Sequence, residues 1–150
     1  MRIWKQGVLF YLGGSIYMIL EFLFRGWSHG SMFLAGGSCF LLLGAFSKSK
    51  HPLPVKAAMG AGAVTAVELL AGLLVNRDYS VWDYRAMPLN FHGQVCLPFT
   101  LLWLPVSVGG MLLYKIVDKG LQQHTQTLSA APWPAATEQQ GAAWVRRRPL

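Results

Sequence analysis

Four long stretches of this sequence are apolar and nearly free of charge, and they constrain its fold more than any other feature. They cover residues 7–24, 31–46, 57–75 and 95–117. A helix needs about 20 apolar residues, with a range of about 17 to 25, to cross a hydrocarbon core about 30 Å thick. Only residues 31–46 are slightly short of that length. Because lipid leaves unpaired backbone groups unsatisfied, each stretch is expected to be a helix.

The composition also indicates a membrane protein. Of the 150 residues, 53% are hydrophobic and 13% are charged, whereas about 25% are charged in a typical soluble domain. The sequence therefore predicts an all-α protein, a four-helix transmembrane bundle in residues 1–119. Residues 120–150 are rich in Gln, Thr, Ala and Pro without an apolar period, which predicts a disordered cytoplasmic tail.

The first apolar stretch has two interpretations, a membrane span or a cleaved signal peptide. It follows Arg2 and Lys5, as a signal peptide would, but it contains Glu21 and ends at Arg25 without a small-residue cleavage site. The span is therefore the preferred interpretation.

The net charge of +7 is unevenly distributed along the chain. Ten of the thirteen Lys and Arg residues fall on one side of the four expected spans: Arg2, Lys5, Lys48, Lys50, Lys56, Lys115, Lys119, Arg146, Arg147 and Arg148. The other side holds Arg25, Arg77 and Arg85. By the positive-inside rule, both termini lie in the cytoplasm and the loops after the first and third spans face outward. Orientation accounts for the charge, so the expected partner is the lipid bilayer and not nucleic acid.

Two glutamates lie inside the expected spans. Glu21 precedes Arg25 by four residues, so the two share a helix face; they form either an ion pair at the interface or the mouth of a polar cavity. Glu68 lies about 10 Å inside the outer end of its span, at about 1.5 Å per residue. An intramembrane acid is a functional-site hypothesis by default. The alternative is a packing carboxyl that pairs with Arg25 or Arg85 or is protonated.

Polar, aromatic and turn-forming residues gather between the third and fourth stretches. Trp82-Asp83-Tyr84 comes first, and the run PLNFHGQVCLPF follows at residues 88–99. Tryptophan and tyrosine favour the membrane interface. We therefore expect one polar pocket, or one interface, that contains Glu21, Arg25, Glu68, Trp82, Asp83, Tyr84 and Asn90.

No pattern in the sequence indicates catalysis or a cofactor. It has no metal-spaced cluster of His or Cys, no Cys-x-x-Cys pair and no paired catalytic carboxylates within a helix turn or two. We expect a protein that is not an enzyme and holds no metal or cofactor.

Two segments resemble a known family. Residues 21–33 read EFLFRGWSHGSMF, and residues 81–99 contain VWDY, PLNF and CLPF. In these elements the chain resembles the putative type IV ABC-transporter family of small bacterial membrane proteins, over about residues 5–117. The resemblance implies motif positions, without assigned chemistry, at Glu21, Arg25, Gly26, Glu68, Trp82, Asp83, Tyr84, Pro88, Asn90, Gly93, Cys96 and Pro98.

The resemblance implies a multi-pass protein of the bacterial cytoplasmic membrane, acting as a permease-like transport component or an accessory subunit of unknown substrate. The sequence has no glycine-rich, lysine-containing nucleotide-binding loop, so an ATPase would be a separate subunit. A homo-oligomer or a membrane-protein partner is expected, because four short helices enclose little volume. The alternative is a non-transporting structural or regulatory protein that docks a partner through its second outer loop.

Overall fold

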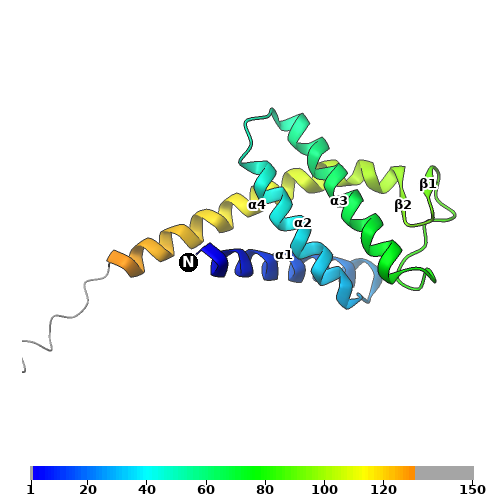
Figure 1. Ribbon diagram of the computed structural model, residues 1–150, viewed down its shortest axis with the longest axis horizontal. Coiled ribbons are helices and arrows are strands. Elements are labelled where there is room, and N and C mark those ends of the chain that lie inside the picture. Colours follow the sequence, from blue (N-terminus) through cyan, green and yellow to red (C-terminus); the bar gives the residue numbers. More distant parts are fainter. Residues whose placement is uncertain (1, 131–150) are drawn as a thin grey trace, which may run out of the picture. The chain divides into compact units, whose positions relative to one another are not determined.

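The computed structural model describes residues 2–130, and four helices dominate it (Figure 1). The elements in chain order are α1 Arg2–Arg25, α2 Gly30–Ser47, α3 Leu53–Val75, β1 Asn90–Phe91, β2 Val95–Cys96 and α4 Leu97–Ala130. All four helices are long and apolar enough to cross a membrane. The expected four-helix transmembrane architecture is thus confirmed.

The helices α1 and α3 begin earlier than the charge-free stretches that predicted them. Helix α1 starts at Arg2 and α3 at Leu53, where residues 7 and 57 were expected. Arginine and lysine are good helix formers, so Arg2 and Lys5 do not end α1. Pro52 is the N-cap of α3, and Pro54 lies in its first turn, where a missing N–H has little cost.

The expected start of the fourth span at residue 95 was wrong by two residues. Val95 pairs with Phe91 and Cys96 pairs with Asn90 in a short antiparallel ladder. The turn between the strands has His92 and Gly93 at φ 52 and 64, and positive φ at both central residues is typical of a hairpin turn. Helix α4 therefore begins at Leu97, directly after the hairpin (Figure 1).

The prediction of a tail from residue 120 also needs correction. Helix α4 continues through Ala130, because the added residues include good helix formers such as leucine, glutamine and alanine. The hydroxyl groups of Thr125 and Thr127 donate to the carbonyls of Leu121 and Gln123 within this helix. The rest of the expected disordered tail, residues 131–150, lies outside the described residues.

The backbone contacts divide the chain into two units, residues 1–118 and residues 119–150. All packing discussed below belongs to the first unit. Within it, α1 and α2 approach each other at glycines. A Cβ on Gly13 would lie 2.3 Å from the Phe40 Cβ, and one on Gly36 would lie 2.4 Å from the Tyr17 Cβ. Small residues that let two backbones approach are a main source of packing energy between helices in lipid.

The part of α4 up to Asp118 packs against α2 and pairs with α1 through large side chains. Tyr114 contacts Phe40 with their ring centroids 5.4 Å apart, and a Cβ on Gly44 would lie 2.1 Å from the Tyr114 ring. Asp118 forms one ion pair with Lys5 at 2.6 Å and a second with Lys48 at 3.4 Å. Helices α1, α2 and α4 are thus connected near the first residues of α1.

Many apolar side chains on the helices are exposed. Leu23 and Phe24 of α1 are 78% and 84% exposed, and Ile116 of α4 is 70% exposed. Soluble proteins rarely expose a continuous apolar surface of this extent. Such a surface fits a helix bundle that has lipid as its solvent.

Candidate functional site

A pocket of about 620 Å³ lies where α1 and α3 end, and all four helices and residues 81–84 line it. Small-molecule sites commonly have volumes of about 300 to 1,000 Å³. The lining combines a mostly apolar wall with a few acidic and aromatic side chains. This combination of an apolar cavity with a few polar groups makes it the candidate site.

Glu68 is the acidic residue of α3 in the pocket wall. The Tyr84 hydroxyl donates to its Oε1 at 3.0 Å, and the Trp103 indole N–H donates to its Oε2 at 3.1 Å. The alternative in which Glu68 pairs with Arg25 or Arg85 is not what the structure shows, because these arginines pair with Glu21 and Asp83. Glu68 is therefore held by two neutral donors.

Glu21 and Arg25 form the ion pair expected from their spacing on one helix face. The Ser28 hydroxyl also donates to Glu21 Oε2 at 2.6 Å. Arg25 Nη1 donates to the carbonyl of Val81 at 2.7 Å. The pair therefore connects the end of α1 to the segment between α3 and α4, and both residues also line the pocket.

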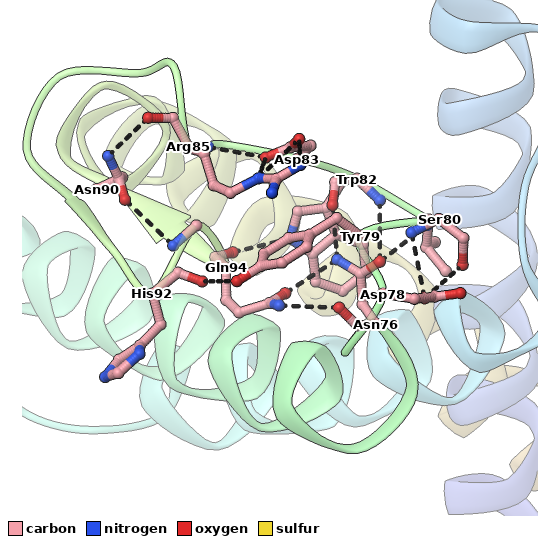
Figure 2. Close-up of polar contacts among 12 residues, drawn as sticks. Asn76, Asp78, Tyr79, Ser80, Trp82, Asp83, Arg85, Asn90, His92 and Gln94 are labelled. Carbon is pink, nitrogen blue, oxygen red and sulfur yellow. Dashed lines mark hydrogen bonds and ion pairs between the residues drawn. The ribbon is translucent and has the colours of Figure 1, made fainter.

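The segment after α3 is organised by two buried amides, Asn76 and Gln94 (Figure 2). Asn76 Nδ2 donates to Gln94 Oε1 at 2.9 Å and to the Trp82 carbonyl at 2.7 Å. Asn76 Oδ1 accepts from the Val81 N–H at 2.8 Å. Gly72 leaves room for this arrangement, since a Cβ there would lie 2.3 Å from Gln94 Oε1. The two amides fix the backbone that carries Trp82.

Trp82 and Tyr84 project from this segment in different ways. The Trp82 ring is buried, and its N–H donates to the Gln94 carbonyl at 2.8 Å. The Tyr84 ring stacks on Phe99 of α4 with centroids 4.8 Å apart. Burial, followed by the negative charge of Glu68, raises the pKa of the Tyr84 hydroxyl above its usual range. Tyr84 therefore remains a hydrogen-bond donor to Glu68 at neutral pH.

Asp83 lies at the edge of the pocket, and its carboxylate is exposed. The Arg85 side chain donates to it, with Nη2 2.7 Å from Oδ2 and Nε 2.9 Å from Oδ1 (Figure 2). Hydrogen bonds from Arg85 lower the pKa of Asp83 to about 2. Asp83 is thus an anion at all physiological pH values.

Asn90 is not among the residues that line the pocket. Its Nδ2 donates to the Met87 carbonyl at 2.9 Å. Figure 2 shows its Nδ2 donating also to the Arg85 carbonyl at 3.2 Å, and its Oδ1 accepting from the Gly93 N–H at 3.1 Å. Asn90 therefore shapes the hairpin turn. The structure brings the other expected site residues together around the pocket: Glu21, Arg25, Glu68, Trp82, Asp83 and Tyr84.

Sequence reasoning missed several lining residues. Trp103 and Phe99 of α4 bind Glu68 and Tyr84 across long sequence separations, and no local pattern marks such contacts. Tyr17 also lines the pocket. Its position four residues before Glu21, on the same helix face, was a usable signal.

The apolar lining extends to the surface of the bundle. Leu20 and Phe24 of α1 line the pocket and are 56% and 84% exposed, and Leu102 and Val106 of α4 line it and are 49% and 42% exposed. We call these four residues the apolar rim. Both helices are candidate membrane spans, so the rim belongs to a surface that faces lipid.

Ionisable side chains of one sign predominate in the lining. Glu21, Glu68 and Asp83 contribute three carboxyl groups, against the one guanidinium of Arg25. The residues that the structure describes contain no cluster of three His, Cys, Asp or Glu side chains able to hold a metal ion. The lining therefore carries more acidic than basic side chains, with Glu21 paired to Arg25 and Asp83 paired to Arg85.

Comparison with protein-family models matches residues 7–137 to the family described as "Putative ABC-transporter type IV". The matched range contains every pocket residue. Comparisons with curated proteins and with solved structures found no match.

Proposed function

Because this chain belongs to the family described as "Putative ABC-transporter type IV", we propose that it is the membrane component of a transport system that uses a separate ATPase subunit. The sequence has no nucleotide-binding loop of the glycine-rich, lysine-containing kind. The chain would contribute the membrane passage or an accessory part of it. The proposal assigns no chemical reaction to the chain.

The observation that carries the proposal is the pocket of about 620 Å³ lined by all four helices, with Glu68 in its wall. A helix bundle that served only as an anchor has no need of an acidic side chain in a cavity, and such a group in a span is costly. A cavity with a few placed polar groups is what recognition of a small molecule requires.

The distribution of basic residues supports an orientation for this pocket. With both termini in the cytoplasm of a bacterial cell, the pocket end of the bundle would face outward. In a single copy of the chain, the pocket has a volume of about 620 Å³ and lies where α1 and α3 end. A second copy of the chain, or another membrane protein, would complete the passage.

The test is purification of the full chain in mild detergent from its native host at native expression, followed by mass spectrometry of the co-purifying proteins and small molecules. A co-purifying ATPase is the expected result. Repeated isolation without any ATPase, from membranes in which the chain is intact, would contradict the proposal.

Two exposed apolar side chains favour the second candidate function, docking of a membrane-protein partner. Leu89 and Phe91, next to the hairpin turn, are 76% and 57% exposed. They belong to the loop and not to a helix. If docking is the function, replacing both by serine abolishes co-purification of the partner, while Glu68→Gln leaves it unchanged.

A further inference from the structure

Among the residues that the structure describes, Glu68 has hydrogen-bond donors but no cationic partner. Its two oxygens accept from the Tyr84 hydroxyl and the Trp103 indole, and it forms no ion pair with any residue in the described part of the chain. A carboxylate has about four acceptor sites, so one hydrogen bond to each oxygen leaves capacity for a further partner. A positive charge in the pocket would therefore meet a carboxyl group that the protein already holds in one orientation.

Aromatic side chains share the pocket lining with this carboxyl. Trp103 and Tyr84 bond to it directly, and Tyr17, Trp82 and Phe99 belong to the same lining. The faces of aromatic rings attract cations within about 6 Å, most strongly when the site is desolvated. A pocket that combines several aromatic rings with a carboxyl group suits organic cations, because water hydrates such cations only weakly.

The other ionisable groups of the lining do not cancel this preference for cations over anions. Arg25 is held by Glu21 and by the Val81 carbonyl. Asp83 adds a further negative charge at the edge, where Arg85 pairs with it. An anionic ligand would therefore approach Glu68 while the Arg25 guanidinium of the lining is already held by other groups.

We propose that the pocket binds a lipophilic organic cation, with its positive charge between Glu68 and the aromatic rings and its apolar groups along the apolar rim. This inference deepens the proposed function, since the bound cation would be the transported substrate. The rim, formed by Leu20, Phe24, Leu102 and Val106, would admit such a molecule from the bilayer.

The test measures binding of radiolabelled tetraphenylphosphonium to the purified full-length chain in detergent. Tetraphenylborate has nearly the same shape and the opposite charge, so its binding, measured in a separate sample without the cation, is the matched control. We expect saturable binding of the cation and none of the anion. Equal binding of the anion, or no binding of the cation to a folded protein, would overturn the inference.

Glu68→Gln tests the role of the carboxyl. The glutamine oxygen can accept from Trp103 and its amide can donate to Tyr84, so the local contacts have replacements. We expect at least about tenfold weaker tetraphenylphosphonium binding, as for loss of one partner of a desolvated charge pair. Asp78→Asn removes the same charge at an exposed site outside the lining and is expected to bind like the unmodified chain. Equal affinity of Glu68→Gln and the unmodified chain would overturn the inference.

Trp103→Leu provides a second variant if Glu68→Gln does not fold. It removes an aromatic ring and the indole donor but leaves the carboxyl. Weaker binding of tetraphenylphosphonium is expected, and unchanged binding would count against the aromatic site. A co-purifying ATPase without cation binding would overturn this inference and keep the proposed function. Cation binding without a co-purifying ATPase would keep this inference and contradict the proposed function.

Discussion

The Asn76 amide donates to the side-chain oxygen of Gln94 at 2.9 Å, and the Gln94 amide donates back to the Asn76 carbonyl at 2.9 Å. Asn76 ends α3 and Gln94 precedes α4, so this reciprocal pair closes the segment between the two helices. Asn76 is fully buried. The pair therefore determines where Trp82 and Tyr84 meet the pocket.

Asn76→Ala is expected to destabilise the protein by about 3 kcal/mol, because it leaves several buried partners without a hydrogen bond. The partners are Gln94 Oε1, the Val81 N–H and the Trp82 carbonyl. Asn90→Ala, at an exposed position, should cost less than about 1 kcal/mol. Unfolding in sodium dodecyl sulfate, followed by circular dichroism, measures both. Similar losses for the two variants would show that the buried pair has no special role.

Gly36→Ala is expected to weaken the packing of α1 on α2 by about 2 kcal/mol, as for other overpacked sites. The new Cβ would lie 2.4 Å from the Tyr17 Cβ. Gly62→Ala is the matched control in α3, because nothing lies within 4 Å of its Cβ position. Alanine favours a helix over glycine, so this control should be neutral or more stable by about 0.5 to 1 kcal/mol. Thermal unfolding in detergent compares them, and equal midpoints would contradict the close approach.

Asp118→Asn should lower the free energy of unfolding by about 2 kcal/mol, because it leaves Lys5 and Lys48 without their acidic partner. The Asp118 side chain is only 10% exposed, so water does little to replace it. Asp78→Asn, at an exposed turn, serves as the control of equal charge change. The same detergent unfolding assay measures both variants. An effect no larger than that of the control would mean that Asp118 does not connect α1, α2 and α4.

The pH dependence of the Asp83–Arg85 pair has a definite sign. Because the pKa of Asp83 is lowered to about 2, its stabilisation is complete above the unfolded pKa of about 3.9 and is lost as pH falls through about 2. The stability difference between the unmodified chain and Asp83→Asn should thus stay constant from about pH 5 to about pH 8. Thermal unfolding of both across this range checks it. A difference that changes near neutral pH would contradict the assignment.

The sequence was sufficient for the helices because hydropathy and span length determine them. It was also sufficient for the Glu21–Arg25 pair, since a separation of four residues places two side chains on one helix face. The ends of the helices were harder to predict from the sequence. A stretch free of charge reports where lipid lies, whereas the helical residues beyond these stretches, such as those of α4 after Val117, follow helix propensity.

The pocket contacts depend on how the chain folds back on itself. Glu68 meets Tyr84 and Trp103 at separations of 16 and 35 residues, and nothing local in the sequence indicates either. Asn90 shows the opposite case. Its position in a motif suggested the pocket, but its side chain bonds to its own turn. Whether the gathered residues bind a ligand stays a prediction until binding is measured.

The exposed rim has a consequence for how affinity is defined. A molecule that reaches the pocket past Leu20, Phe24 and Leu102 comes from the bilayer, so its relevant concentration is its mole fraction in lipid and not its molarity in water. The apparent dissociation constant would then increase with the amount of detergent or lipid in the assay, because more host phase dilutes the same ligand. Affinities from different preparations would agree only after correction for partitioning.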